Sequence, residues 1–416
     1  MQTVRLDEGL FRTDADNGVI VLSEQIHGVR SVAVGIWVKT ASVHEARGKM
    51  GVSHLLEHMV FKGTERRSAR DIALELEVRG GSLDAFTSRD HTSYQSRTLD
   101  DDLPRALDVL TDLFRNPVLR ASDLELERRV VLEEISTVED TPDDLVFDLH
   151  SATLWPDHPY GFPILGTRDT VGSLAADDLK ALHQRAYHPR HVVIAAAGSL
   201  EHGVLLNLLA KCGWFTFDPG PEPVTVQSVP AGVRATKRVA RESAQTHIVM
   251  ATDTVPYRDM RRYPILLINT VLGSGMSSRL FQRVREELGL AYAVYAFQSF
   301  YRHSGLAGVY VGTHPSRAQQ AMDAIAVELN RMAEEGLTAD ALAEAKQQVK
   351  GQITLSLESP SARMHRLAGL ALYEEPYRTI DQTLAEIDKV STGDIAAVAN
   401  EFFRADRQTV VWLGPN

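Results

Sequence analysis

Residues 54–58 carry the side chains best suited to metal chemistry in this sequence. They read HLLEH, with His54 and His58 around Glu57, and Glu134 follows 76 residues after the second histidine. On a helix, the two histidines lie one turn apart and point the same way. Two imidazoles so placed can bind one side of a tetrahedral zinc ion, and Glu57 can take a proton from a metal-bound water. The spacing therefore predicts a hydrolase, and among hydrolases a peptidase.

The order of these residues is the inverted zinc-peptidase pattern, His-x-x-Glu-His. Alone, the pentapeptide also fits a surface helix that happens to carry two histidines. The flanking residues favour the metal interpretation, because Leu55, Met59 and Phe61 can anchor the helix in a core, and Gly63 is a plausible C-terminal stop. A helix that holds metal ligands needs such anchoring.

A third ligand is predicted from the acidic stretch 122–139, which reads as one helix. Glu127 and Glu134 are seven residues apart and share one face of it. One of them can bind metal while the other orients a ligand. Glu133 points about 100° away and is the alternative ligand. Taken alone, the stretch would be read as an acidic, solvated helix face.

With these motifs, the chain resembles the pitrilysin/insulinase-type metallopeptidases. It is most similar to the short-chain branch that includes the β subunit of mitochondrial processing peptidase and its bacterial relatives. The matching segments are VSHLLEHMVFKGT, RGGSLDAFTSRDHTSY, ELERRVVLEEI, WPDHPYGFPILGT, YHPRHVVIAAAG and VREELGLAYAVYA. Their order and number make a chance resemblance very improbable.

The resemblance implies a zinc endopeptidase with one Zn²⁺ per chain. His54, His58 and Glu134 are then the metal ligands, and Glu127 is a group behind them that orients or tunes the site. Glu57 is the general base for the zinc-activated water. The expected substrates are short or unfolded peptides.

The segment that follows Gly80 and Gly81 is expected to form a strand at a sheet edge. In the family, the matching edge binds the substrate backbone by strand addition. The candidate substrate-binding residues are Asp84, Ala85, Phe86, Thr87 and Ser88. The family usually has Asn where this chain has Asp84, and an ionised Asp accepts hydrogen bonds but cannot donate them.

Arg285 and Tyr292 match a pair that the family places across the cleft from zinc. Tyr292 would donate to the developing oxyanion, and Arg285 would hold a substrate carbonyl. In short-chain relatives this pair comes from the second subunit. The resemblance therefore implies a clamshell-like homodimer whose active sites are shared between subunits.

The expected fold class is α+β, with two homologous domains, each a largely antiparallel β-sheet packed with α-helices. The proline-rich residues 218–235 are the expected linker between an N-terminal zinc-binding domain, 1–217, and a C-terminal domain, 236–416, that carries the Arg/Tyr pair. An alternating strand is predicted at 31–39 and a helical apolar stripe at 103–114. In the second half, strands are predicted at 247–252 and 409–413, and helices at 264–272, 318–335 and 339–356.

Composition limits the remaining function classes. The net charge of −11 argues against nucleic acid as a main partner, and no apolar run reaches the ~18 residues that span a membrane. The start of the chain has no pattern of a secretory signal, and its single cysteine, Cys212, suits a reducing compartment. A cytoplasmic protein of bacterial type is expected.

Two alternatives to an active homodimer stay open. The chain could be a catalytically silent structural subunit, like the core proteins of respiratory complex III, which resemble this family. It could also be a peptidase that is active only with a distinct partner subunit. The presence of HLLEH, Glu134, Arg285 and Tyr292 in one chain argues against the first alternative.

Overall fold

A computed structural model describes residues 1–415, which form two compact units of mixed helix and strand. Unit 1 contains Met1–Ile135, Pro163–Val226 and Ser356–Tyr377. Unit 2 contains Ser136–Phe162, Gln227–Leu355 and the residues from Arg378 onward. Each unit is built around its own β-sheet, so the predicted α+β class with two sheets packed by helices is confirmed.

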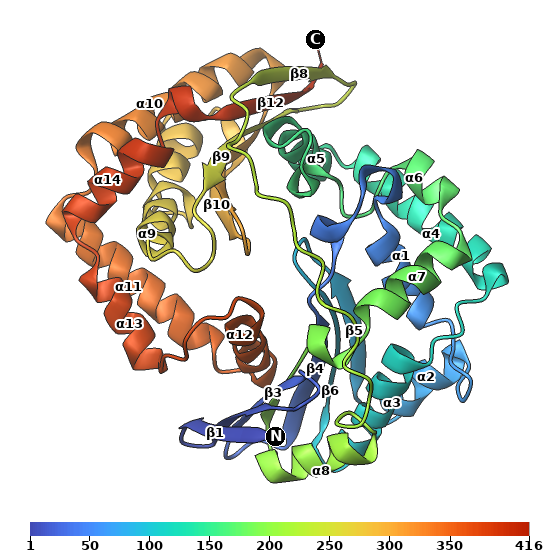
Figure 1. Cartoon of the computed structure of the whole chain (residues 1–416). Helices are drawn as coiled ribbons and strands as arrows, with labels where there is room; N and C mark the ends of the chain where they lie inside the picture. The colour runs from blue at the N-terminus through green and yellow to red at the C-terminus, as the bar shows by residue number, and fades with distance from the viewer. Residues whose placement is uncertain (416) are drawn as a thin grey trace. The chain divides into compact units, whose positions relative to one another are not determined.

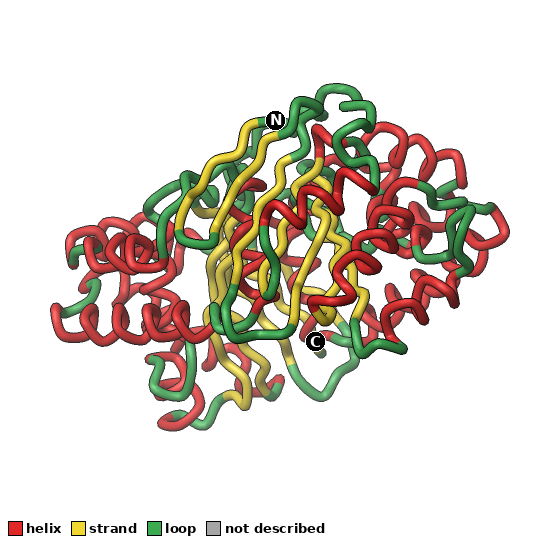
Figure 2. Tube along the Cα trace, turned by 90° about the horizontal axis from the view of Figure 1, so that it is seen from below, coloured by secondary structure: helices red, strands yellow, loops and turns green. Residues whose placement is uncertain are grey.

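The sheet of unit 1 has seven strands in the order β1-β2-β3-β7-β4-β6-β5. Only the pair β3–β7 is parallel, and the other neighbours are antiparallel. The predicted edge strand is β5, which pairs with β6 on one side and lies at the end of the sheet. The strands are β1 (Gln2–Asp7), β2 (Leu10–Asp14), β3 (Ile20–Gln25), β4 (Ser31–Val38), β5 (Ser82–Thr87), β6 (Thr92–Leu99) and β7 (Val192–Gly198). Figure 2 shows strands lying side by side next to the N-terminus, with helices around them.

Strand β4 shows why both faces of this sheet are covered. Its alternating residues Val32, Val34 and Ile36 are fully buried in the core formed with α1 and α3. The residues between them, Ala33 and Trp37, are also buried, but in a second core on the opposite face. Period-2 alternation places the two sets on opposite sides of the strand, so each side needs its own helical cover.

Helices of unit 1 supply both covers. One core packs α1, α2, α3, α7 and α8 around the sheet, and α12 packs on β3, β4 and β7 from the other side (Figure 1). The helices are α1 (Val52–Val60), α2 (Ala69–Glu77), α3 (Leu103–Arg115), α4 (Ala121–Asp140), α6 (Arg168–Ser173), α7 (Ala176–Ala186), α8 (His202–Lys211) and α12 (Pro360–Leu372).

The sheet of unit 2 has five strands in the order β10-β11-β9-β12-β8. Its only parallel pair is β12–β8. The strands are β8 (Thr236–Ala240), β9 (Thr246–Thr254), β10 (Ala291–Phe300), β11 (Gly305–Thr313) and β12 (Thr409–Gly414); the helices are α5 (Pro142–Leu154), α9 (Arg262–Gly273), α10 (Ala318–Glu335), α11 (Ala339–Ser356), α13 (Ile380–Lys389), α14 (Thr392–Phe402) and the π-helical η6 (Phe281–Glu287). Short 3₁₀ turns lie at η1 (Ser42–His44), η2 (Arg47–Lys49), η3 (Asp100–Asp102), η4 (Pro159–Gly161), η5 (Pro189–His191), η7 (Pro315–Arg317) and η8 (Ala405–Arg407).

Unit 1 is formed mainly by the first half of the chain and unit 2 mainly by the second half. Each half also contributes one helix to the unit that the other half mainly forms. In the first half, α4 is followed by α5, which packs on β9 and β12 of unit 2. In the second half, α11 is followed by α12, which packs on the sheet of unit 1. Both transferred helices begin with proline, Pro142 and Pro360, a residue favoured at the first helical position. Both halves thus contain a long helix followed by a helix that packs in the other unit, and this shared order agrees with two related halves.

Residues 218–235 contain no helix and no strand. The division of the chain into domains 1–217 and 236–416 with this segment as linker stays a prediction.

Candidate metal centre

Helix α1 carries the HLLEH residues and is anchored as the sequence predicts. Leu55 and Met59 are buried, while Phe61 is partly buried against the same core. The helix ends at Val60, before the expected stop at Gly63. Gly63 has a φ of 129° and forms a bridge with Ser68, so this glycine permits the turn after the helix.

His54, His58 and Glu134 come together between α1 and α4. His54 Nε2 lies 3.7 Å from Glu134 Oε2, and His58 Nε2 lies 3.6 Å from Glu134 Oε1. One ligand atom of each residue lies within 4.8 Å of the other two. Ligands around a tetrahedral zinc with bonds of about 2.1 Å stand roughly 3.4 Å apart. Two imidazole nitrogens and a carboxylate oxygen at these distances fit zinc, while the alternative ligand Glu133 is exposed and lies outside the group.

The imidazole of His54 is held in its neutral form. Burial, followed by the nearby His58, lowers the pKa of His54 to about 4. Neutral imidazole is the form that binds a metal. Its Nδ1 is buried and has no hydrogen-bond partner within residues 1–415.

His58, by contrast, is oriented by a chain of two charged groups. Its Nδ1 donates to Glu127 Oε2 at 3.1 Å, because a carboxylate can only accept. The other oxygen, Oε1, accepts from Lys62 Nζ at 2.5 Å. Glu127 is 6% exposed. With the proton fixed on Nδ1, the lone pair of Nε2 faces Glu134, which is the arrangement that typically supports metal-binding histidines.

Glu57 lies one residue before His58 and has a different environment. Its carboxylate is buried, and Oε2 accepts a hydrogen bond of 2.5 Å from Thr87 Oγ1 on β5. Burial is the largest influence and raises the pKa of Glu57, while the Thr87 bond and His58 act in the opposite direction. A carboxyl group with a raised pKa next to a metal centre is suited to exchange protons.

The candidate substrate strand presents two faces. Leu83 and Ala85 pack against the core that contains α1. Phe86 points to the opposite face, where its ring stacks on His365 of α12 with centroids 6.2 Å apart. Asp84 is exposed on that same face.

Ser88 lies just after β5 and is occupied by the turn to β6. Its backbone N–H and its Oγ both donate to the carbonyl of His91. Its own carbonyl accepts from Ser42 Oγ at 3.3 Å. The free edge of the strand is therefore limited to Ser82–Thr87.

Arg285 and Tyr292 lie together in unit 2. Arg285 belongs to the π-helical turn η6, and Tyr292 lies at a register shift of β10, between Ala291 and Ala293. A bulge of this kind re-aims a side chain, and Tyr292 is 75% exposed.

Two residues near the metal group were not anticipated from the sequence. Glu45 accepts hydrogen bonds from the backbone at the start of α1, and Lys62 binds Glu127 as described. Lys62 follows α1 within the VSHLLEHMVFKGT segment. Since the acidic helix is expected to pack beside the histidines, a lysine at this point in the sequence is a signal for an ion pair with one of its carboxylates. Glu45 lies in irregular backbone, where the sequence gives no such signal.

Five histidines outside the HLLEH segment bond to the backbone. They bond to backbone carbonyl oxygens: His150 to Ala251 and Thr409, His158 to Gln227, His183 to Phe114, His188 to Gln184 and His191 to Pro221. Cys212 is partly buried against the core of unit 1, and burial raises the pKa of its thiol. A thiol with a raised pKa is a poor nucleophile at neutral pH.

None of the helices in residues 1–415 is both long enough and apolar enough to cross a membrane.

Sequence comparison matches two family models to the chain. Residues 20–168 match the insulinase family of peptidases, family M16, and residues 173–349 match the M16 inactive domain.

Bacterial relatives named as uncharacterized zinc proteases cover nearly the whole chain. A protein of Streptomyces coelicolor is 38% identical over 97% of this chain and 89% of its own length. One from Bacillus subtilis is 37% identical over 95% of this chain and 96% of its own. A third, from Mycobacterium tuberculosis, is 36% identical over 97% of this chain and 93% of its own.

Two crystal structures share the fold. A peptidase M16 inactive domain from Pseudomonas fluorescens superposes with a TM-score of 0.89, with 21% identity and 98% of each chain covered. A protease from Helicobacter pylori gives a TM-score of 0.90 at 21% identity, with 98% of this chain and 99% of the other covered. With both halves matched by family models and close relatives along its length, the chain belongs to the insulinase-type M16 peptidase family.

Proposed function

We propose that this protein is a zinc-dependent endopeptidase that hydrolyses short or unfolded peptides. The observation that carries the proposal is the group His54, His58 and Glu134, whose ligand atoms lie within 4.8 Å of one another, with the buried Glu57 beside it. The names of the bacterial relatives agree with this function.

His54, His58 and Glu134 would hold one Zn²⁺, and three protein ligands leave a fourth position open. When bound, zinc lowers the pKa of a coordinated water towards neutrality and polarises the carbonyl to be cleaved. Glu127, supported by Lys62, keeps His58 in the tautomer and orientation that binding requires.

Glu57 is the proposed general base. Thr87 occupies its Oε2, so Oε1 is the atom left to hold the proton taken from the attacking water. The same oxygen then delivers that proton to the leaving amine. The hydrogen bond from Thr87 fixes the carboxylate while the proton moves.

The peptide would lie along the free edge of β5. Every second residue of an edge strand directs its N–H and C=O away from the sheet, so an extended peptide can pair with Asp84–Thr87 as an added strand. Binding by strand addition recognises the peptide backbone more than the side chains. It requires a substrate without stable structure of its own.

Arg285 and Tyr292 would complete the site from a second copy of the chain, in a clamshell-like homodimer. Tyr292 would donate to the developing oxyanion, and Arg285 would hold a substrate carbonyl. The high exposure of Tyr292 and the contact between the two side chains support a role outside the core.

The first test is to incubate the purified chain with a quenched, unstructured basic peptide, with and without a chelator, alongside metal analysis. We expect cleavage that the chelator abolishes and about one zinc per chain. Glu57→Gln protein is the control for a contaminating protease. Bound zinc without cleavage would indicate the partner-dependent alternative, and neither zinc nor cleavage would indicate the structural subunit.

A further inference from the structure

The N-terminus of α1, the helix that carries His54 and His58, is held by a side chain from outside the helix. Glu45 lies between β4 and α1 and is 7% exposed. Its Oε2 accepts from the backbone N–H of Gly51 at 2.8 Å, and its Oε1 accepts from that of Ser53, also at 2.8 Å. The N-cap residue, Gly51, has no side chain to cap the helix itself. One carboxylate thus satisfies two of the donors that a helix N-terminus leaves free.

A second loop packs against this same turn. Gly51 has a φ of 87°, and a Cβ there would lie 2.5 Å from the carbonyl oxygen of Leu165. Gly166 has a φ of 78°, and its Cβ would lie 2.4 Å from the carbonyl oxygen of Met50. The two backbones touch with no room for a side chain, so the first turn of α1 is fixed between Glu45 and this loop.

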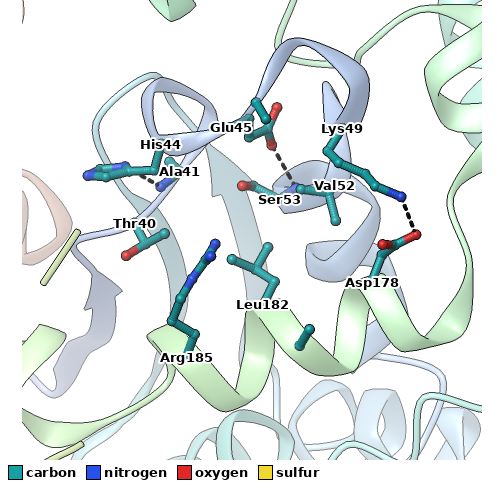
Figure 3. Close-up of a pocket in the computed structure, with 12 residues that line it drawn as sticks. Thr40, Ala41, His44, Glu45, Lys49, Val52, Ser53, Asp178, Leu182 and Arg185 are labelled. Carbon is teal, nitrogen blue, oxygen red and sulfur yellow. Dashed lines mark hydrogen bonds and ion pairs between the residues drawn. The ribbon is translucent and has the colours of Figure 1, made fainter. Parts of the chain in front are cut away.

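Within residues 1–415, the carboxylate of Glu45 accepts from the backbone N–H groups of Gly51 and Ser53. Burial and hydrogen bonds set the pKa of Glu45, and no cation is among its causes. Lys49, four residues after Glu45, is paired instead with Asp178 at 2.7 Å. Figure 3 shows both interactions, with Glu45 reaching Ser53 and Lys49 reaching Asp178 at the side of one cavity.

This cavity of about 230 Å³ lies behind the start of α1 and is lined in part by Thr40, His44, Glu45, Ser53 and Arg185. Burial raises the pKa of Glu45 to about 7, although its hydrogen bonds favour the charged form. These hydrogen bonds favour the charged form because each carboxylate oxygen accepts from one backbone N–H at the start of α1.

Ser53 directly precedes His54, and Glu57 follows one turn later. A shift of the first turn therefore moves a metal ligand and the base together. Metal and catalytic groups need placement within about 0.5 Å. We propose that Glu45 is a positioning residue for the metal centre, whose buried carboxylate fixes the first turn of α1 and with it His54 and Glu57. This inference rests on the proposed zinc function.

Glu45→Gln tests the proposal with little change of shape. The amide keeps one acceptor, but its NH₂ faces a backbone N–H, which leaves two donors opposed in a buried site. We expect zinc to bind roughly 10-fold more weakly, measured by competition with a chromophoric chelator. Glu45→Asp, which keeps the charge but is one methylene shorter, should also weaken binding, because it cannot reach both donors.

Glu24→Gln is the matched control. Glu24 is 8% exposed and pairs with Arg363 of α12, on the face of the sheet opposite α1. Its substitution should leave the zinc dissociation constant within about twofold of wild type. The melting temperature of each metal-free protein separates positioning from stability, since a purely structural residue would change stability and leave the affinity of the folded protein unchanged.

Hydrogen exchange of the metal-free proteins gives a readout that does not depend on zinc. Glu45→Gln should raise the exchange rate of the α1 amides and leave β4 unchanged. Unchanged exchange in α1 would overturn the proposal, as would wild-type zinc affinity in the variant. If the wild type binds no zinc, the proposed function fails, and the exchange measurement still decides whether Glu45 positions the helix.

Discussion

The guanidinium carbon of Arg285 lies 4.7 Å from the centroid of the Tyr292 ring, and also 4.7 Å from that of Phe281. Cation–π contact of this kind holds a side chain in place without burying it. Tyr292 is thus exposed yet restrained, on a bulge of β10 beside the π-helical turn that carries Arg285. Local departures from regular helix and strand often accompany functional sites.

Tyr292→Phe should lower kcat/KM by roughly 100-fold or more if its hydroxyl donates to the oxyanion. Zinc content should not change, because Tyr292 is not a ligand. Peptide cleavage and metal analysis of the same preparation measure both. Tyr295→Phe is the matched control on the same strand, and an equal loss there would contradict the assignment to Tyr292.

A mixture of two inactive variants tests whether the sites are shared between subunits. Glu57→Gln and Tyr292→Phe protein, once their subunits exchange, form mixed dimers with one complete site each. Since about half the dimers are mixed, activity should recover to about a quarter of wild type. No recovery, with exchange verified by differently tagged subunits, would rule out the arrangement in trans.

Glu57→Gln should bind zinc and lose hydrolysis by a factor of about 10² to 10⁴. The amide still accepts from Thr87, but it cannot take a proton from water. Single-turnover cleavage and metal analysis measure the two effects separately. Loss of zinc in this variant would show that Glu57 supports the ligands and does not act as the base.

Glu127→Gln should weaken zinc binding by roughly 10- to 100-fold, because His58 loses its charged acceptor. Lys62→Met should have a smaller effect in the same direction, since it acts through Glu127. Competition with a chelator measures both constants. Glu133→Gln, six residues further along the same helix and exposed, should bind zinc like wild type; a loss there would reopen its assignment as a ligand.

Stability should depend on pH through Glu45. Folding raises the pKa of this carboxyl from its ordinary 4.5 to about 7, so the folded state binds the proton more tightly than the unfolded chain. The free energy of unfolding therefore falls as pH rises from about 4.5 to 7, by about 3 kcal/mol. Glu45→Gln lacks this dependence, and its unfolding free energy should gain that amount relative to wild type between pH 4 and pH 8. Urea unfolding of the metal-free proteins measures it, and parallel pH curves would contradict it.

The regular elements could be predicted from the sequence because their apolar periodicity is local. The stretch 122–139 forms α4 at 121–140, and the alternation at 31–39 forms β4 at 31–38. The apolar residues Met364, Leu367 and Ala371 also follow a helical period, but nothing local shows that they pack on β4 and β7. That pairing depends on long-range topology.

Among the side-chain pairs around the site, some follow from local spacing in the sequence and others depend on long-range structure. Glu127 and Glu134 share a face through helix geometry alone, so spacing predicts that they lie together. That this face meets His58 depends on how α4 packs on α1. The bond between Glu45 and Ser53 depends on the path of an irregular loop. The bulge at Tyr292 depends on the register of β10 against β11, which a single sequence does not reveal.

The transfer of α12 to unit 1 has a consequence for the order in which the protein is made. Strands β3, β4 and β7 are complete once Gly198 has been synthesised, yet the helix that covers their second face ends at Leu372. At about 5–20 residues per second, the ribosome needs on the order of 10 to 30 s for that interval. During this time Trp37 and the apolar residues around it face solvent. The nascent chain therefore exposes an aggregation-prone apolar sheet face until α12 has been synthesised.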